Sequence, residues 1–125
     1  MILDTDALSA FIDGDVGVGD LLRRESRAAV PAIVLGEFRY GIADSRHRAA
    51  YEDWLDTHLP EFEILFVSDE TAVAYAELRV SLRGPGRSIP ANDAWIAALA
   101  LEHRLPVLSR DQHFDGISGL TRKSW

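Results

Sequence analysis

Cysteine is absent from this 125-residue chain, and lysine occurs once, at Lys123. Without cysteine, the chain has no disulfide, no thiolate ligand for zinc and no cysteine nucleophile. Its longest apolar runs are too short to span a bilayer, and its first residues, MILDTD, lack a basic and apolar leader. We therefore expect a cytoplasmic protein without a membrane segment. The glycine-rich stretch 14–19 carries no lysine, which argues against a phosphate-binding P-loop.

The scarcity of lysine also weighs against two acidic α/β classes. Haloacid-dehalogenase-like phosphatases begin with a D-x-D sequence such as Asp4-Thr5-Asp6, whose first aspartate is a nucleophile. They also require an internal lysine, and a threonine or valine where this chain has Leu8; phospho-receiver domains require the lysine too. Ser118 lacks the G-x-S-x-G pattern of serine hydrolases. A haloacid-dehalogenase-like phosphatase is therefore a distant third among the possible functions of this chain.

The chain does have the composition of one folded domain. Hydrophobic residues make up 47% of it and charged residues 26%, without a low-complexity tract. We expect a single domain over residues 1–125. Twenty acids against thirteen bases give a net charge of −7, which taken alone argues against a polyanionic partner.

Short apolar runs alternate with segments of helical periodicity. We expect strands at 1–3, 28–30, 64–67, 106–109 and 120–121, and helices at about 5–12, 20–26, 31–42, 51–59, 68–83 and 91–103. Because helices separate the strands, the connections must cross over the sheet, which makes the sheet mainly parallel. The predicted fold class is α/β, with three α/β/α layers and no internal repeat.

Four carboxylates stand where chemistry collects in such a sheet. Ligands bind beyond the carboxyl ends of parallel strands, where Asp4 and Asp111 follow two of the predicted strands. Asp93 opens the helix 91–103, and Glu37 sits among apolar residues of the helix 31–42. Each has a plain structural explanation as a cap, a helix-dipole partner, a surface residue or a turn residue.

A cluster of these acids would need compensation. Two charges about 4 Å apart repel by roughly 4 kcal/mol at an effective dielectric constant near 20, so a cluster must bind protons or cations. All-oxygen ligation without histidine or cysteine favours Mg²⁺ or Mn²⁺ over zinc, and such ions favour phosphate substrates.

Four segments, taken in order, carry a family resemblance: Leu3-Asp4-Thr5-Asp6, the run PAIVLGE at 31–37, the run NDAWIAA at 92–98 and Leu108-Ser109-Arg110-Asp111. Together they resemble the PIN-domain nucleases and, more narrowly, the VapC toxins of bacterial VapBC toxin–antitoxin pairs. The resemblance covers essentially the whole chain. It implies a PIN-like fold and a Mg²⁺- or Mn²⁺-dependent endoribonuclease that cuts structured RNA, often tRNA or rRNA, by metal-activated water.

The same resemblance implies roles for individual residues. The catalytic and metal-binding quartet is Asp4, Glu37, Asp93 and Asp111. Supporting positions are Thr5 and Ser109 through their hydroxyls, and Asp115, which could help to hold water or a second ion. Asp6 adds a carboxylate without an assigned role.

The resemblance further implies a cognate VapB-like antitoxin that silences the enzyme, a homodimer, and contact with DNA only through the antitoxin. In such proteins the helical hairpin, here 31–59, contributes to gripping the antitoxin and to dimer contacts, so we expect an exposed apolar strip there. Its aromatic residues are Phe38, Tyr40, Tyr51 and Trp54. The alternative is a catalytically inert PIN-like module that acts through its antitoxin in operon repression; retention of all four acids favours the enzyme.

An RNA substrate needs a cationic surface. No acid lies between Glu77 and Asp93, whereas Arg79, Arg83 and Arg87 fall in that interval. Arg79 and Arg83 share one face of the predicted helix and are candidate phosphate contacts, although an ordinary solvated face explains them equally well. The four histidines show no metal-ligand spacing, and we expect them to serve in packing or at the surface.

Overall fold

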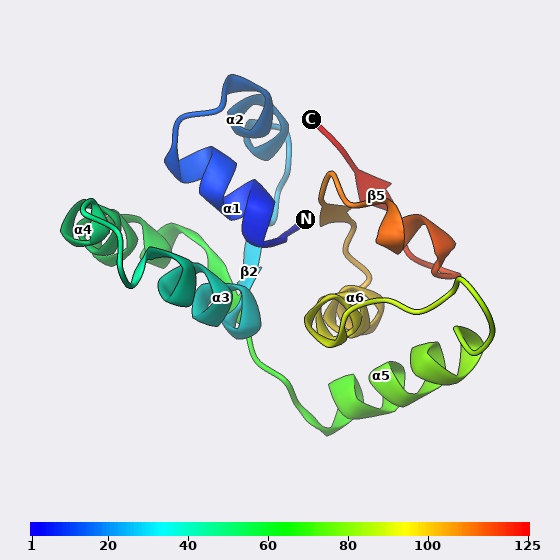
Figure 1. Cartoon of the computed structure of the whole chain (residues 1–125). Coiled ribbons are helices and arrows are strands. Elements are labelled where there is room, and N and C mark those ends of the chain that lie inside the picture. The colour runs from blue at the N-terminus through cyan, green and yellow to red at the C-terminus, as the bar shows by residue number, and fades with distance from the viewer.

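The computed structural model describes residues 1–125, in which short strands alternate with helices (Figure 1). The strands are β1 (Ile2–Leu3), β2 (Ala29–Pro31), β3 (Glu63–Leu65), β4 (Val107–Leu108) and β5 (Arg122–Lys123). The α-helices are α1 (Thr5–Ile12), α2 (Val16–Arg23), α3 (Ala32–Ile42), α4 (Arg48–His58), α5 (Asp69–Ser81) and α6 (Ala91–His103). Two short 3₁₀ helices complete the chain, η1 (Leu59–Glu61) and η2 (Gln112–Gly116).

All five strands run parallel, in the order β3-β2-β1-β4-β5. This confirms the predicted parallel α/β class. Right-handed crossovers place α1 to α4 on one face of the sheet and α5 and α6 on the other, which gives three layers. The chain leaves β1 toward β2 and leaves β4 toward β5, in opposite directions. A crevice therefore opens beyond the carboxyl ends of the neighbouring strands β1 and β4.

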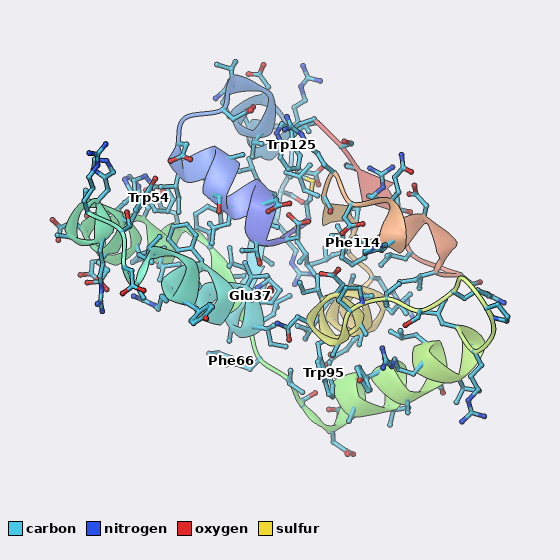
Figure 2. The ribbon with its side chains drawn as sticks, in the orientation of Figure 1. Glu37, Trp54, Phe66, Trp95, Phe114 and Trp125 are labelled. Carbon is cyan, nitrogen blue, oxygen red and sulfur yellow. The ribbon has the colours of Figure 1, made fainter.

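The centre of the sheet is fully buried. The side chains of β1 and β4 are 0% exposed, and they lie in one core with residues of every α-helix. Helix α6 has the predicted bounds, and its apolar surface explains its position: it packs against α5, where Trp95 stacks on Tyr75 with ring centroids 3.8 Å apart (Figure 2). Each helix is too short or too polar to cross a lipid bilayer.

The second helix begins earlier than predicted. We expected residues 20–26 and took the glycines before them as a loop, whereas α2 spans Val16–Arg23. The Asp15 side chain caps it by accepting a hydrogen bond from the N–H of Val18 at 3.1 Å. At Gly17 inside this helix, an added Cβ would lie 3.2 Å from the capping oxygen, Asp15 Oδ1, so a larger residue would crowd the cap.

Two strands and one helix end also differ from the prediction. The strand expected at 64–67 is β3 at Glu63–Leu65, and the apolar residues Phe66 and Val67 that follow it are 69% and 46% exposed. The strand expected at 120–121 is β5, two residues later, where two charged side chains suit an edge strand. Helix α5 ends at Ser81 instead of continuing to Arg83.

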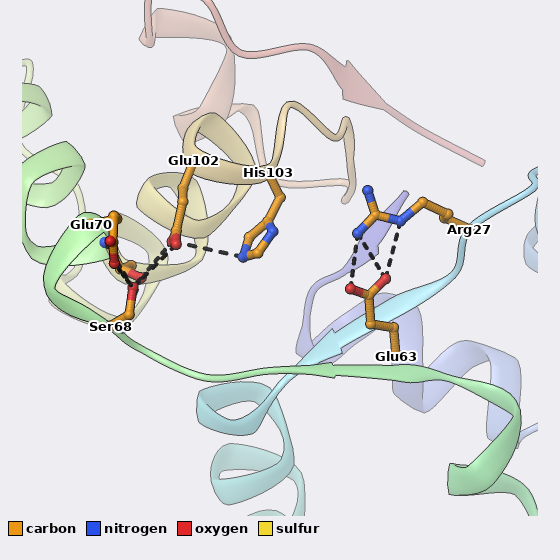
Figure 3. Close-up of polar contacts among 7 residues, drawn as sticks. Arg27, Glu63, Ser68, Glu70, Glu102 and His103 are labelled. Carbon is orange, nitrogen blue, oxygen red and sulfur yellow. Dashed lines mark hydrogen bonds and ion pairs between the residues drawn. The ribbon is translucent and has the colours of Figure 1, made fainter.

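Polar contacts fix the start of β3 and the connection that follows it (Figure 3). At the first residue of the strand, the Glu63 carboxylate forms a forked pair at 2.8 to 3.1 Å with the guanidinium of Arg27, which lies in the connection before β2. After it, Ser68 caps α5 in a reciprocal capping box with Thr71. The buried Thr71 hydroxyl donates to Glu102 of α6, and Ser68 Oγ lies 3.2 Å from the same carboxylate. These contacts hold α5 and α6 together at one end.

Candidate functional site

Asp4 directly follows β1 and is the most buried acid of the predicted quartet, at 6% exposed. One carboxylate oxygen accepts a hydrogen bond from the N–H of Ala7 at 2.8 Å and thereby caps α1. The register of β1 against β4 brings Ser109 beside it, and the two side chains are hydrogen-bonded. Burial raises the pKa of Asp4 to about 6, despite these bonds, and the charges of Asp6 and Asp93 add to the increase.

Asp93 lies in the first turn of α6 and is partly buried. Burial raises its pKa, and the nearby charges of Asp111 and Glu37 act in the same direction, while a hydrogen bond from His113 opposes them. Asp93 is therefore within electrostatic reach of the other three acids, because its charge also acts on Asp4.

Asp111 sits in the turn between β4 and η2. Its backbone N–H donates to Ser109 Oγ at 2.9 Å, and its carboxylate caps η2 by accepting from the N–H of His113 at 2.9 Å. The His113 ring lies between two of the acids: its Nδ1 is 3.0 Å from Asp111 Oδ1 and 3.5 Å from Asp93 Oδ2. Ligand atoms of these three residues all lie within 4.8 Å of one another, a spacing that could hold a metal ion.

His113 is the member of this cluster that the sequence did not predict. We looked for histidines at metal-ligand spacing from one another and found none. The available signal was its position two residues after Asp111, a separation that a capped turn converts into direct contact.

Glu37 reaches the cluster from α3. It lies on the part of the helix that faces α6 (Figure 2), and its Oε1 accepts a hydrogen bond from the Thr5 hydroxyl at 3.0 Å. Thr5 is the residue after Asp4, so α1 supplies the group that orients a side chain of α3. The predicted supporting position of Thr5 therefore has a specific contact in the structure.

The four acids converge from the ends of β1 and β4 and from two helices at the crevice of the sheet. No lysine or arginine lies within ion-pair distance of any of them, and His113 is the one basic partner of Asp93 and Asp111. The four carboxylates form a donor set of hard oxygens, which suits Mg²⁺ or Mn²⁺. The His113 imidazole adds a nitrogen, a ligand that also suits zinc, so the expected all-oxygen ligation without histidine does not describe this cluster.

Asp115 makes a different contact. Both of its oxygens are engaged by the Arg122 guanidinium, at 2.7 and 2.9 Å, which ties η2 to β5 and lowers the pKa of Asp115. Arg122 also donates to the backbone oxygen of Ser109 at 3.0 Å. Asp115 thus supports the segment that carries Asp111, and a role in holding water or an ion stays a prediction.

The three candidate RNA-binding arginines are exposed, but they do not share one helix face. Arg83 lies beyond the end of α5, so the predicted pairing with Arg79 on that helix is wrong. Arg79 has an internal role as well, because its guanidinium donates to the backbone oxygen of Ile89 at 3.2 Å and lies 5.6 Å from the Tyr75 ring centroid. Arg87 belongs to the connection between α5 and α6.

The aromatic residues of the helical hairpin are mostly internal. Phe38 is 4% exposed and meets Tyr51 edge-on, and Trp54 meets Phe11 in the same way. Tyr40 alone of the four is highly exposed, at 86%. The apolar strip expected on the hairpin is therefore reduced to one residue. Other large exposed apolar residues lie at the start of α2, after β3 and on α5, at Val16, Phe66, Val67, Val73 and Val80.

The α/β/α fold, with acids gathered at the crevice between β1 and β4, places this chain in a known class of proteins. That class is the PIN domain, whose family model matches residues 1–120. The chain is 35% identical over 96 residues to ribonuclease VapC5 of Mycobacterium tuberculosis, covering 74% of this chain and 70% of that one. It is 32% identical over 107 residues to ribonuclease VapC2 of Rickettsia felis, covering 85% and 80%.

Solved structures agree. The chain matches the structure of Rickettsia felis VapBC2 bound to a DNA fragment from its promoter with a TM-score of 0.89 and 26% identity, covering 99% of this chain and 97% of that one. It matches the Neisseria gonorrhoeae FitAcB structure with a TM-score of 0.83 and 27% identity, covering 97% and 94%. The chain belongs to the PIN-domain family and, within it, to the VapC ribonucleases.

Proposed function

We propose that this protein is the ribonuclease toxin of a VapBC-type pair and that it cleaves structured RNA, of the tRNA or rRNA class, with the help of Mg²⁺ or Mn²⁺. The convergence of Asp4, Glu37, Asp93 and Asp111 at the crevice between β1 and β4 carries the proposal. Acting on RNA made in the cell, it would work in the cytoplasm.

The donor set fits a hard divalent cation. Asp4 and Asp93 both have raised pKa values because they are buried near other acids. His113 is the one basic side chain within ion-pair distance of the four acids, so it can offset at most one of their charges. A cation supplies further positive charge. When bound, Mg²⁺ or Mn²⁺ would offset the charge of the scissile phosphate and make water a better nucleophile.

The chain's own residues then have distinct tasks. Asp4 and Asp93 are the ligands we expect to matter most, because they are the most enclosed. Glu37, oriented by Thr5, and Asp111, oriented by Ser109, hold the ion directly or orient the attacking water. His113 donates to the carboxylates beside it and keeps their oxygens in place. No protein nucleophile is required.

Replacing Asp93 with Asn tests the proposal. The purified Asp93→Asn protein should cleave RNA at least a hundredfold more slowly than the wild type in Mg²⁺ or Mn²⁺, and the wild type should lose activity in EDTA. Arg24→Ala, which alters an exposed side chain at the end of α2, serves as the control. Cleavage by Asp93→Asn at the wild-type rate, or full activity in EDTA, would contradict the assignment.

A VapB-like antitoxin and a second copy of this chain are the partners we propose. The Rickettsia felis VapBC2 structure described above is bound to a DNA fragment from its promoter, which supports an antitoxin that carries the DNA contact. The exposed residues Tyr40, Phe66 and Val73 provide apolar area for such contacts.

Induction in a bacterial host separates the toxin from the inert alternative. Expression of the wild type should arrest growth, co-expression of the product of a neighbouring small reading frame should relieve the arrest, and Asp4→Ala should abolish it. Arrest that persists in Asp4→Ala would favour a module that acts by binding alone. Mapping RNA 5′ ends after brief induction, against Asp93→Asn, would identify the substrate.

A further inference from the structure

A cavity of about 270 Å³ lies beside the acidic cluster, between the α5–α6 connection and η2. Residues that line it include Leu82, Arg87, Ile89, Gln112, His113 and Gly116. We name it the Arg87 cavity. His113 belongs both to this lining and to the cluster, since its ring lies 3.0 Å from Asp111. The cavity therefore opens next to the place where RNA would be cut.

Its lining combines apolar and polar surfaces. Leu82 and Ile89 are buried core residues that present aliphatic atoms to it. Gly116 leaves one wall open, because an added Cβ would meet no atom within 4 Å. The exposed side chains of Arg87 and Gln112 supply a cation and an amide at the edge. A flat ring with a polar edge and an attached anion matches these surfaces, and a nucleotide is such a ligand.

The two cavities that adjoin the acidic cluster differ in charge. A second cavity of about 320 Å³ touches the cluster through Thr5 and Glu37, and it is also lined by Asp13 and Tyr51. Its two carboxylates repel phosphate. The segment that carries Arg87 has no acid between Glu77 and Asp93, so the RNA backbone is drawn toward the Arg87 cavity.

The cationic surface continues beyond this cavity. An adjoining cavity of about 260 Å³ is lined by Arg79 and Arg83 and shares Leu82, Ser88 and Ile89 with the first. The three arginines, which do not share a helix face, thus line two adjoining cavities. Each cavity therefore offers at least one arginine to the phosphates of an RNA strand.

We propose that the Arg87 cavity binds a single unpaired RNA nucleotide adjacent to the scissile phosphate. Arg87 contacts its phosphate, Leu82 and Ile89 contact the face of its base, and Gln112 hydrogen-bonds the base edge. At about 270 Å³ the cavity is slightly smaller than most ligand pockets (about 300–1,000 Å³), a size that suits one nucleotide better than a base pair. RNA is commonly read through unstacked bases of loops, so the cavity would select a loop nucleotide by its identity. The proposal rests on the proposed ribonuclease function.

Binding can be measured without cleavage. Each of the four ribonucleoside 5′-monophosphates is titrated into ¹⁵N-labelled protein in EDTA, and amide shifts are followed by NMR. We expect shifts in residues 84–90 and 112–116, with one base bound in preference to the others. Arg87→Ala and Gly116→Leu should each weaken binding at least fivefold, and Arg24→Ala should not change it. Shifts confined to the Glu37 side, or unchanged affinity in both Arg87→Ala and Gly116→Leu, would overturn the proposal.

Cleavage of a randomised RNA pool tests selection of the base. The wild type should favour one nucleotide at a fixed position next to the cut, and Gln112→Ala should reduce that preference at least fivefold. A preference that survives in Gln112→Ala and in Gly116→Leu would overturn the assignment. If the wild type cleaves no RNA, the proposed function fails, while the NMR titration still decides whether the cavity binds nucleotides. Thermal melting of each variant shows whether it is folded.

Discussion

Asp4 combines two roles that the sequence presents as alternatives. As the first acid after β1, it could cap the following helix or hold a cation. The structure shows the cap, through the N–H of Ala7, and also buries the carboxylate beside Asp93. A carboxylate has two oxygens and several acceptor positions, so capping leaves capacity for a cation. Burial makes the negative charge of Asp4 energetically costly, and a bound cation would offset that cost.

Stability of the metal-free protein should depend on pH through Asp4. Its pKa rises from 3.8 to about 6 on folding, so the folded state binds more protons between these values. The free energy of unfolding therefore falls as the pH rises through this window, by about 3 kcal/mol, and stays low above it. Asp4→Asn retains the capping oxygen and removes the charge. In EDTA at pH 7.5 it should be more stable than the wild type by up to that amount.

Chemical denaturation at pH 4 and pH 7.5 measures the effect. The difference between Asp4→Asn and the wild type should nearly vanish at pH 4, and Asp56→Asn, which alters an exposed acid of α4, should show no such pH dependence. Equal stability of Asp4→Asn and wild type at pH 7.5 would contradict a buried, uncompensated charge.

Divalent cations should restore the stability of the wild type. A ligand that binds only the folded state at a hundred times its dissociation constant stabilises it by about 2.7 kcal/mol. MgCl₂ or MnCl₂ should raise the melting temperature of the wild type and leave that of Asp93→Asn almost unchanged. The response should weaken below about pH 6, because protons compete for Asp4. Equal shifts for both proteins would show that the ions act elsewhere.

Thr5 should act on the reaction through Glu37. Its hydroxyl is the hydrogen-bond donor that orients Glu37 Oε1. Thr5→Val keeps the shape of the side chain and removes the donor, and loss of such a supporting contact costs about 10- to 100-fold in activity or metal affinity. Thr5→Ser should recover most of the loss. An unchanged kcat in Thr5→Val, with normal stability, would show that Glu37 needs no orientation.

Helices with strong local signals were predicted well. Helix α6 has the predicted bounds because its apolar run is bracketed by Pro90 and by Arg104 in a left-handed conformation, and α5 begins at the predicted Ser68 cap. Helix α2 was misplaced because glycines were taken as loop signals, although Asp15 caps a helix through them. Strand β5 has no apolar signal, since pairing with β4 alone defines it.

The Ser68 capping box should contribute to stability and not to chemistry. Ser68 accepts from the N–H of Thr71 at the start of α5 and contacts Glu102 in the last turn of α6, at the opposite end of that helix from Asp93. Loss of an N-cap costs about 1 kcal/mol, so Ser68→Ala should lower the free energy of unfolding by about that amount. Its RNA cleavage rate in the folded state should stay at the wild-type value. Ser68→Asp, which can still cap, provides the matched control.

Across the whole chain, the position of Asp4 and Asp111 at one edge of the sheet was predictable, and the surroundings of the acidic cluster were not. Asp4 and Asp111 follow from strand ends, and a parallel sheet brings those ends to one edge. His113 joins the cluster through the geometry of a turn, and the arginine-lined cavities depend on how a loop packs on η2; neither has a periodic signal in the sequence. The acidic quartet also accounts for more than half of the net charge of −7. Without the quartet, sixteen acids face thirteen bases, a net charge of −3.

The position of β4 has a consequence for synthesis of the protein. This strand, built from residues 107 and 108, lies in the middle of the sheet, where Val107 pairs with Ile2 of β1. A nascent chain that has not yet reached β4 lacks one wall of the crevice together with Asp111 and His113. The crevice and its acidic cluster can therefore form only after β4 has been synthesised and has paired with β1.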